Sequence, residues 1–415
     1  MPARHSIWLP TLFVGMLALG TDEFVIAGLL PSVADDLGVS AGTAGQLVTA
    51  FALAFALGAP VLAVLTDRLD RKRLLTSGLL VFVLANAAVA LSDDFALTLG
   101  LRIVAGLAAA VVSPTCMAIA GTAAPEDRRG RYLAVVTAGL TVALFTGVPL
   151  GAFLGEALSW RATFVLIAAV AAIVLVLAHL FAPSVPGGEP SDLAARLAPI
   201  RNPRVLLLVA AMFFSGAGGL AFYNYLGAIL DDRLGATPGE VAFALIVVGV
   251  IGVVAVFLGG SLSDRLGPRR ASALVLGGHC LALGAVAIHL HSAGELGAAT
   301  FALVAVWSVF AWGLSPVMQA AVLGASGSRP MAAMSLGISG LYGGSAVGAA
   351  VGGYLFDQHG PALIPVAGTA FLAVAVLSAV LGTRPARLTG DVAQGTEGTE
   401  GEEGAERPVN RHSRS

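Results

Sequence analysis

The sequence predicts an all-α polytopic membrane protein, with twelve transmembrane helices in two pseudo-symmetric bundles of six. Apolar residues make up 57% of the 415-residue chain and charged residues only 12%, about half of the ~25% usual in soluble proteins. Apolar runs of roughly 20 residues recur along the chain, and each can cross a hydrocarbon core of ~30 Å as a helix. Two unrelated sequence features also recur at one common distance, which indicates a duplicated six-helix unit.

Basic residues predict the orientation of the spans, because Lys and Arg favour cytoplasmic loops. Of the 23 basic residues, 20 lie at the two ends or in one set of alternate loops, whereas the opposite set holds only Arg161 and Arg233. Both termini are therefore expected in the cytoplasm, which requires an even number of spans. The expected spans are 7–34, 43–65, 74–92, 95–123, 131–157, 161–182, 204–230, 239–262, 271–291, 296–323, 331–356 and 360–382.

The spans fall into two groups of six. The N-terminal bundle is expected to cover residues 1–182 and the C-terminal bundle residues 204–383. Between them, residues 183–203 begin with Pro and Gly and contain SDLAARLA, which predicts a short surface helix within a cytoplasmic linker. The low-complexity, acidic end of the chain, 384–415, lacks apolar anchors. It is expected to be a disordered cytoplasmic tail.

Two features recur 197 residues apart. The loop TDRLDRKR (66–73) has a counterpart in SDRLGPRR (263–270). A glycine ladder also recurs, and small residues at this spacing let another helix approach closely. Pro149, within the first ladder, is expected to kink its helix because it lacks a backbone N–H. The ladders consist of Gly147, Gly151 and Gly155, and of Gly344, Gly348 and Gly352. Since six spans return the chain to the same side, the halves should be related by an axis along the membrane normal.

Several motifs resemble those of the major facilitator superfamily. GSLSDRLGPRR (260–270) matches the family's loop motif throughout, and AVLTDRLDRKR (63–73) departs from it at Ala63 and Asp70. LGLRIVAGLAAA, in span four, is similar to the family's arginine-glycine motif. GLTVALFTGVPLG, in span five, is similar to the glycine-proline motif of drug/proton antiporters, although Val148 interrupts its Gly-Pro pair.

The resemblance covers about residues 7–382 and implies the major facilitator fold. It also implies secondary transport by alternating access, and the span-five motif implies proton-coupled export rather than uptake. GTDEFVIAGLLPSVADDLGVS (20–40) further resembles the branch that contains arabinose-type and chloramphenicol-type exporters, where a Glu at the position of Glu23 is common.

Glu23, Asp22 and Arg102 are the candidates for proton coupling. Asp35 marks the outer end of span one, so Glu23 lies ~18 Å inward at 1.5 Å per residue, and Arg102 lies ~12 Å beyond Asp94 in span four. Charges at this depth face the interior and pair, so we expect Glu23 to pair with Arg102. Burial and a guanidinium act in opposite directions on a carboxylate's proton affinity. The alternative to proton coupling is that these charges form a fixed structural ion pair. Adjacent residues point ~100° apart on a helix, so Asp22 is expected to face elsewhere.

The repeated loops supply candidates for gating. Their aspartates and arginines lie at cytoplasmic helix ends, where a charge network between the halves could hold one side of the protein closed. Topology alone would explain the arginines but not the repeated aspartates. The candidates are Asp67, Arg68, Arg71, Asp264, Arg265 and Arg269.

Polar and aromatic residues within the spans are candidates for binding cargo, because such groups need partners or water in a membrane. An interfacial aromatic belt is an equal alternative for those in span seven. The candidates are Gln46, Tyr223, Asn224, Trp312 and Gln319.

The sequence favours transport over catalysis. No nucleotide-binding motif, nucleophile motif or metal-ligand set is present, so we expect no enzyme activity, no metal and no cofactor, with a proton gradient as the energy source. A net charge of −2 argues against a nucleic-acid partner. The leading hypothesis is a monomeric exporter in the cell inner membrane that exchanges a largely apolar compound, such as a chloramphenicol-like antibiotic, for protons. Export of sugars or other polar metabolites, and a non-transporting membrane sensor, are the alternatives.

Overall fold

The structure is a computed structural model that describes residues 7–188, 193–292, 296–327 and 330–384. The predicted tail, 384–415, lies outside these residues except for Arg384. Six of the basic residues used to predict the orientation also lie outside them: Arg4, Arg329, Arg387, Arg407, Arg411 and Arg414.

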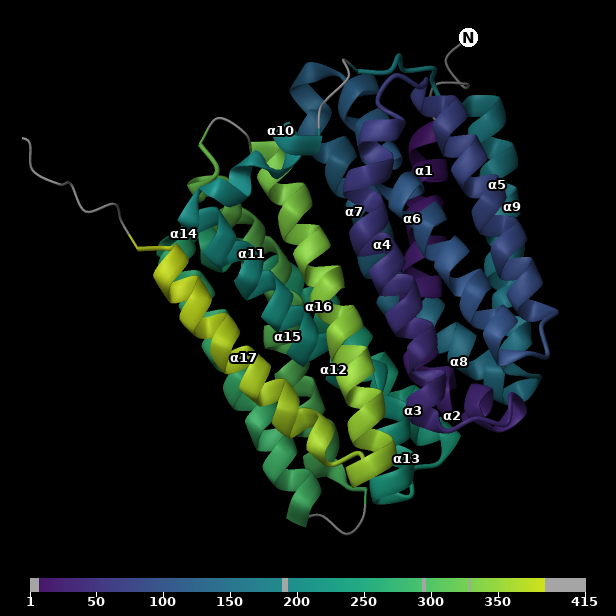
Figure 1. Cartoon of the computed structure of the whole chain (residues 1–415), viewed down its shortest axis with the longest axis vertical. Helices are drawn as coiled ribbons and strands as arrows, with labels where there is room; N and C mark the ends of the chain where they lie inside the picture. Colours follow the sequence, from purple (N-terminus) through teal and green to yellow (C-terminus); the bar gives the residue numbers. More distant parts are fainter. Residues whose placement is uncertain (1–6, 189–192, 293–295, 328–329, 385–415) are drawn as a thin grey trace, which may run out of the picture. The chain divides into compact units, whose positions relative to one another are not determined.

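Helices make up nearly all of the described chain (Figure 1). The N-terminal half consists of α1 (Trp8–Phe24), α2 (Ile26–Asp36), α3 (Ala41–Ala44), α4 (Gln46–Leu65), α5 (Arg71–Ala90), α6 (Phe95–Ala123), the 3₁₀ turn Glu126–Arg128, α7 (Arg129–Phe145), α8 (Gly147–Ala157) and α9 (Trp160–Phe181). The segment between the halves forms α10 (Leu193–Leu197) and the 3₁₀ turn Ala198–Arg201, so the short helix expected there is confirmed over these residues.

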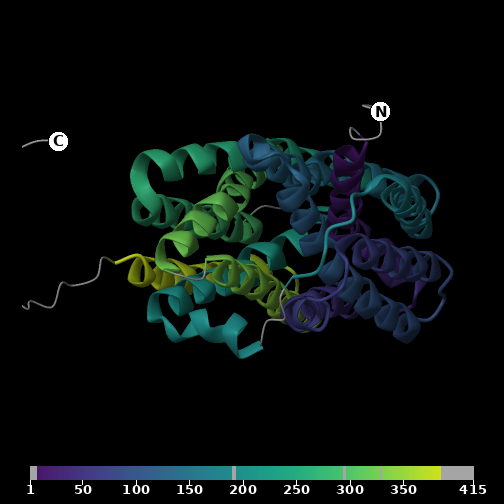
Figure 2. The ribbon, with the colours of Figure 1, turned by 90° about the horizontal axis from the view of Figure 1, so that it is seen from above.

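The C-terminal half consists of α11 (Pro203–Ser215), a π-helical segment η4 (Gly216–Leu220), α12 (Ala221–Asn224), α13 (Leu226–Leu234), α14 (Pro238–Ser292), α15 (Ala298–Ala325), α16 (Pro330–His359) and α17 (Leu363–Gly382). Within residues 1–383, which form one compact unit, the two halves meet where α16 packs on α4, α14 on α7 and α13 on α2. Figures 1 and 2 show the purple-to-blue helices of the first half beside the green-to-yellow helices of the second.

The described helices account for twelve spans. Ten helices are long and apolar enough to cross a membrane, and α1 with α2, bent by 51°, makes an eleventh. The twelfth arises because α14, at 55 residues, is interrupted at Gly267 (φ 73°, ψ 162°). A straight helix of that length would extend ~80 Å, more than twice a hydrocarbon core of ~30 Å. Gly267 tolerates this left-handed φ because it lacks a Cβ.

Span five breaks where its proline removes a hydrogen bond. Helix α7 ends at Phe145 and α8 begins at Gly147, two residues before Pro149, with Thr146 at φ −118° between them. Since Pro149 has no N–H to donate to the carbonyl four residues earlier, Phe145 is the position where the ladder is interrupted. The helix is thus interrupted at Thr146, three residues before the proline at which a kink is expected.

Both glycine ladders pack against the first span of their own half. A Cβ on the first ladder would collide with Thr21, Val25 or Leu29 of the first span. A Cβ on the second would collide with backbone atoms of Phe213 and Ala217 or with the ring of Tyr225. The first ladder is Gly147, Gly151 and Gly155, and the second is Gly344, Gly348 and Gly352. The same packing in both halves agrees with the internal repeat.

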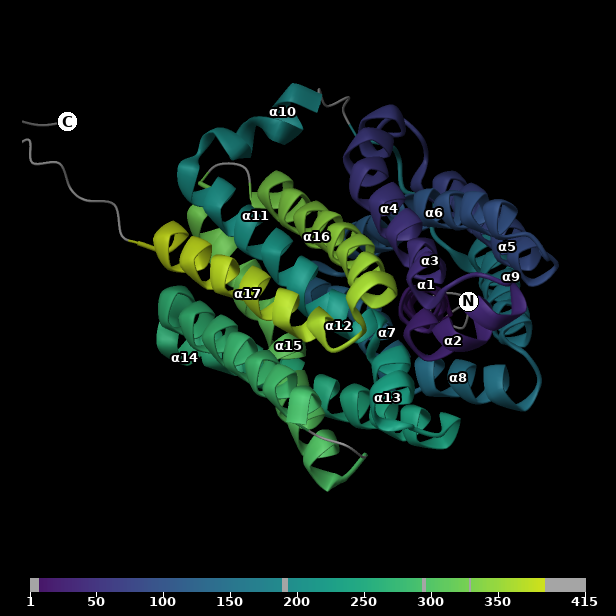
Figure 3. The ribbon, with the colours of Figure 1, turned by 60° about the horizontal axis from the view of Figure 1, so that its bottom comes forward.

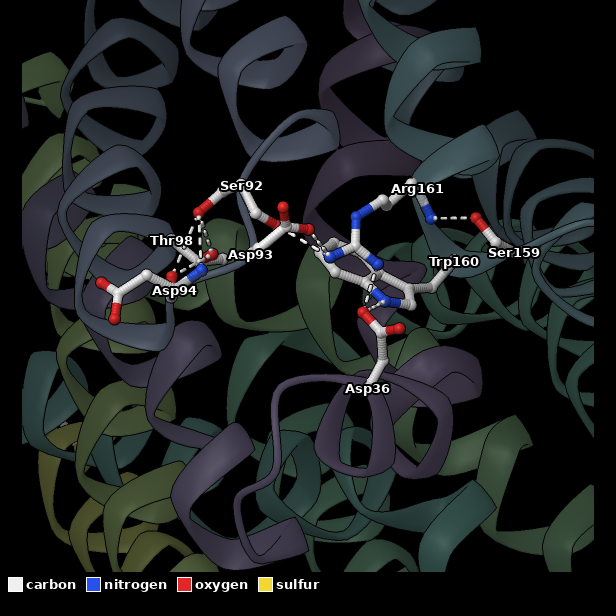
Figure 4. A network of polar contacts seen from close by, with 8 residues as sticks. All are labelled: Asp36, Ser92, Asp93, Asp94, Thr98, Ser159, Trp160 and Arg161. Carbon is white, nitrogen blue, oxygen red and sulfur yellow. Dashed lines mark hydrogen bonds and ion pairs between the residues drawn. The ribbon is translucent and has the colours of Figure 1, made fainter.

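A polar network joins three ends of helices in the N-terminal half (Figure 4). The guanidinium of Arg161 forms ion pairs with Asp36 and with Asp93 (2.7 Å), donates to the carbonyl oxygen of Ser92 (2.9 Å), and stacks over Trp160 at 4.5 Å. Arg161 is one of the two arginines that depart from the basic-residue asymmetry. Its position is explained by these contacts, which tie together the ends of α2, α5 and α9.

Candidate functional site

The two acids of the first span lie directly before a bend. Asp22 and Glu23 occupy the last turn of α1, and the chain turns by 51° at Val25 before α2 begins. Because neighbouring side chains on a helix diverge by ~100°, the two carboxylates meet different partners. The partner of Asp22 belongs to the N-terminal half, and the partner of Glu23 belongs to the C-terminal half.

Asp22 forms a buried ion pair with Arg102. Nη1 of Arg102 lies 2.7 Å from Oδ1 of Asp22, and Nη2 donates to the backbone oxygen of Asp22 at 3.3 Å. Asp22 is 0% exposed and Arg102 1% exposed. The guanidinium carbon also lies 4.5 Å from the centre of the Phe51 ring, a distance suited to a cation–π interaction. The predicted partner of Arg102 is therefore wrong: the helical phase of α1 turns Asp22, and not Glu23, toward Arg102 of α6.

Glu23 instead accepts a hydrogen bond from the C-terminal half. The hydroxyl of Tyr342, in α16, donates to Oε2 of Glu23 at 2.6 Å. The Tyr342 ring stacks on Phe55 of α4, with 4.1 Å between ring centroids and 24° between ring planes. Two contacts from one tyrosine thus join α16 to α1 and α4 at the depth of the acids.

Glu23, Arg102 and Tyr342 line a narrow pocket between the halves, whose cavity volume of about 10 Å³ is room for about one water molecule. One wall comes from the N-terminal half and the other from the C-terminal half. The lining residues are Glu23, Phe24, Val48, Phe51, Ala52, Arg102, Leu220, Asn224, Tyr342 and Ser345. Five of these lining residues are apolar, and the other five carry a carboxylate, guanidinium, amide or hydroxyl group; sites for small molecules likewise combine apolar walls with a few polar groups.

Three of the five predicted cargo-binding candidates lie at or beside this pocket. Asn224 lines it, and the rings of Tyr223 and Trp312 pack edge-on against Phe24, at centroid distances of 5.8 and 5.4 Å. Gln46 lies elsewhere, at the start of α4 beside the backbone of Gly353.

The fifth candidate, Gln319, lies in α15 and donates to Ser315 at 3.0 Å. It is not among the residues that line the pocket. This hydrogen bond lies within α15, so the contact does not point to cargo.

The repeated loop motifs differ between the halves. Asp67 is only 6% exposed, and both of its carboxylate oxygens accept hydrogen bonds from Nη2 of Arg196, at 2.7 and 2.8 Å. Arg71 lies 3.9 Å from the same carboxylate and donates to the backbone oxygen of Asp67 at 3.2 Å. Since Arg196 belongs to α10, the first motif holds the segment that connects the halves. Helix α10 contacts both α4 and α16.

The second motif makes no such contact in the described part of the chain. Asp264, Arg265 and Arg269 are exposed, as is Arg68 in the first motif. Among the described residues, none of these four forms an ion pair. The two motifs are thus alike in sequence but not in their surroundings.

Comparison with known proteins assigns the family. The sequence profile of the Major Facilitator Superfamily matches residues 12–327 and 228–411. This chain belongs to the major facilitator superfamily. The predicted fold class is thereby confirmed.

Similar proteins include further transporters. The chain is 34% identical to a chloramphenicol resistance protein of Streptomyces lividans over 81% of this chain and 86% of that protein. It is 28% identical to the inner membrane transport protein YdhP of Escherichia coli K12 over 91% of this chain and 96% of that one. A crystal structure of a mutant of the peptide transporter POT shares the fold, with a TM-score of 0.73 at 15% identity, covering 90% of this chain and 93% of that one.

Sequence reasoning missed Tyr342 and Arg196, which are the hydrogen-bond partners of the predicted site residues Glu23 and Asp67. Tyr342 lies beside the second glycine ladder, and a tyrosine hydroxyl at membrane depth requires a partner. That signal was available, but the identity of the partner, 319 residues earlier, was not. Arg196 lies in the linker, where an arginine predicts only the orientation of the spans, and its charge gives no indication that Asp67 is its partner.

A further contact joins the two halves of this transporter at the end expected to face outward, where α3 and α13 lie (Figure 3). The carboxylate of Asp357, at the end of α16, accepts hydrogen bonds from the hydroxyl of Ser40 (2.6 Å) and the backbone N–H of Gly42 (3.1 Å). A Cβ on Gly42 would collide with the backbone oxygen of Gly353. We call the contact between Asp357, Ser40 and Gly42 the outer latch.

Proposed function

We propose that this chain exports a small, largely apolar compound across the inner membrane in exchange for protons, by alternating access of its two halves. The observation that carries the proposal is the position of Glu23. Its carboxylate lies at the junction of the halves, in a pocket half of whose lining residues are apolar, and its hydrogen-bond partner belongs to the opposite half.

The surroundings of Glu23 favour a titrating role over a fixed ion pair. Arg102, the nearby cation, is already paired with Asp22, so the Glu23 charge lacks a dedicated counter-ion among the described residues. A carboxylate in such a place can exchange a proton when the pocket opens to water, and an unpaired charge at membrane depth marks a pathway for ions or substrate.

The pocket favours an apolar, aromatic cargo over a sugar. Phe24 and Phe51 contribute to its walls, and Tyr223 and Trp312 pack directly behind Phe24. Chloramphenicol-like compounds are the first cargo to test, in accord with the resistance protein of Streptomyces lividans named above. A membrane potential of ~100 mV supplies ~2.3 kcal/mol for each charge moved, enough for roughly 50-fold accumulation.

The experiment compares Glu23→Gln with Glu156→Gln in vesicles at matched expression. Glutamine keeps the size and the hydrogen-bonding capacity of Glu23 but cannot titrate. Export of chloramphenicol driven by a proton gradient should therefore be lost. Glu156 is an exposed glutamate of the same half, so its substitution should leave export unchanged. Full proton-driven export by Glu23→Gln would remove Glu23 from the mechanism.

A further inference from the structure

Tyr342 is inserted from the C-terminal half into the N-terminal half. Its hydroxyl meets Glu23 of α1 and its ring meets Phe55 of α4. The helix that carries it is held firmly to its own half, because the backbone of α16 at Gly344 and Gly348 approaches the backbone of the first span of that half too closely to admit a Cβ. A movement of the C-terminal half relative to the N-terminal half must therefore move Tyr342 relative to Glu23.

We propose that Tyr342 is the positioning residue that couples the protonation of Glu23 to the packing of the two halves. This inference deepens the function proposed above and rests on it. The hydroxyl donates to the Glu23 carboxylate and thereby holds the halves together around the pocket. When Glu23 takes up a proton, this contact weakens and the halves are freer to separate at this level.

The chemistry of the hydrogen bond supports this role. A phenolic O–H that donates to a carboxylate forms a charge-assisted bond, about twice as strong as a bond between neutral groups. A protonated Glu23 still offers its carbonyl oxygen as an acceptor, but without the charge. The proton thus changes the strength of a contact between the halves without requiring any other group to move.

The other polar groups around Glu23 do not offer this contact. From the N-terminal half, Asp22 and Arg102 face it as a pair whose charges offset one another. From the C-terminal half, Tyr223 lies close by and packs on Phe24. Among the described residues, only Tyr342 donates a hydrogen bond to the Glu23 side chain. Protonation of Glu23 therefore affects the contact with the opposite half through Tyr342.

The test measures the distance between the halves as a function of pH, without cargo. Spin labels are placed at Asp127→Cys and Met331→Cys, whose side chains are each 74% exposed and lie in different halves. The background carries Cys116→Ala and Cys280→Ala, which replace both native cysteines. The full-length protein is studied in lipid nanodiscs, and pulsed electron spin resonance gives the distance distribution above and below neutral pH.

In protein with Tyr342 intact, the distribution of distances between the two labels should shift as pH falls. The shift should favour the state in which Tyr342 and Glu23 are apart. Hydrogen bonds to charged groups exceed neutral ones by an amount that corresponds to roughly tenfold in the ratio of the two populations. Tyr342→Phe keeps the ring stacked on Phe55 and removes only the hydroxyl, so this shift should be lost. Glu23→Gln, measured in the same way, should also show no shift, because its acceptor is neutral at every pH.

Tyr354→Phe is the matched control, since Tyr354 lies on the same helix and is 62% exposed. It should keep the full shift. The inference is overturned if Tyr342→Phe retains the shift, if Tyr354→Phe loses it equally, or if the protein with both tyrosines shows none. If the shift depends on Tyr342 but the protein shows no export driven by a proton gradient, the proposed function alone is overturned.

Discussion

Removal of either partner of the buried ion pair between Asp22 and Arg102 should destabilise this protein strongly. The members of the pair are 0% and 1% exposed, with 2.7 Å between Oδ1 and Nη1. Removal of one partner from a buried pair leaves the other charge uncompensated and costs ~3–5 kcal/mol. We therefore expect Arg102→Met to lower the free energy of unfolding by about this amount, and Asp22→Asn to have a similarly large effect.

A double variant separates the cost of an unpaired charge from the value of the pair itself. Asp22→Asn with Arg102→Met removes both charges at nearly constant volume, and neutral replacements of buried pairs are often tolerated. The double variant should therefore regain most of the stability that either single variant loses. The remaining loss would include the cation–π contact of Arg102 with Phe51, which contributes up to ~2 kcal/mol when desolvated.

The assay is unfolding of the purified protein in mixed micelles as the fraction of denaturing detergent rises, followed by tryptophan fluorescence. Arg128→Met is the matched control, because Arg128 pairs with Asp127 at the surface, where their side chains are 63% and 74% exposed. This control should unfold as the unsubstituted protein does. The reasoning is refuted if Arg102→Met is no less stable than Arg128→Met, or if the double variant is as unstable as the sum of the single ones.

Three further predictions concern gating and topology. Asp67→Asn should impair export more than Asp264→Asn, because Asp67 is buried against Arg196 while Asp264 is exposed; equal losses in a vesicle export assay would contradict this. Ser40→Cys with Asp357→Cys should form a disulfide that blocks export until a reductant is added, because the outer latch must open during the cycle. Unimpaired export by the cross-linked protein would show that the latch does not move. A reporter inserted between α5 and α6 should read external and one inserted after α10 cytoplasmic, and the reverse result would overturn the predicted orientation.

Much of the architecture could be predicted because it depends on short-range patterns. The length and apolarity of each run are enough to define a membrane span, since lipid requires every backbone hydrogen bond to be satisfied within the helix. The break before Pro149 follows from one missing N–H. The family motifs around Asp67 and Asp264 and the shared offset of 197 residues predicted the fold class, which the comparisons confirm.

The partners of the polar groups could be decided only by the tertiary structure. Sequence placed Asp22, Glu23 and Arg102 at similar depth, but two acids ~100° apart on one helix cannot be distinguished until the bend at Val25 and the position of α6 are known. Tyr342 and Arg196 lie far along the chain from Glu23 and Asp67, and nothing local relates them. The sequence by itself determined which side chains need partners in a membrane, because burial of a charge is costly wherever it occurs. Which partner each one meets depends on how the helices pack, and therefore on contacts between residues hundreds of positions apart.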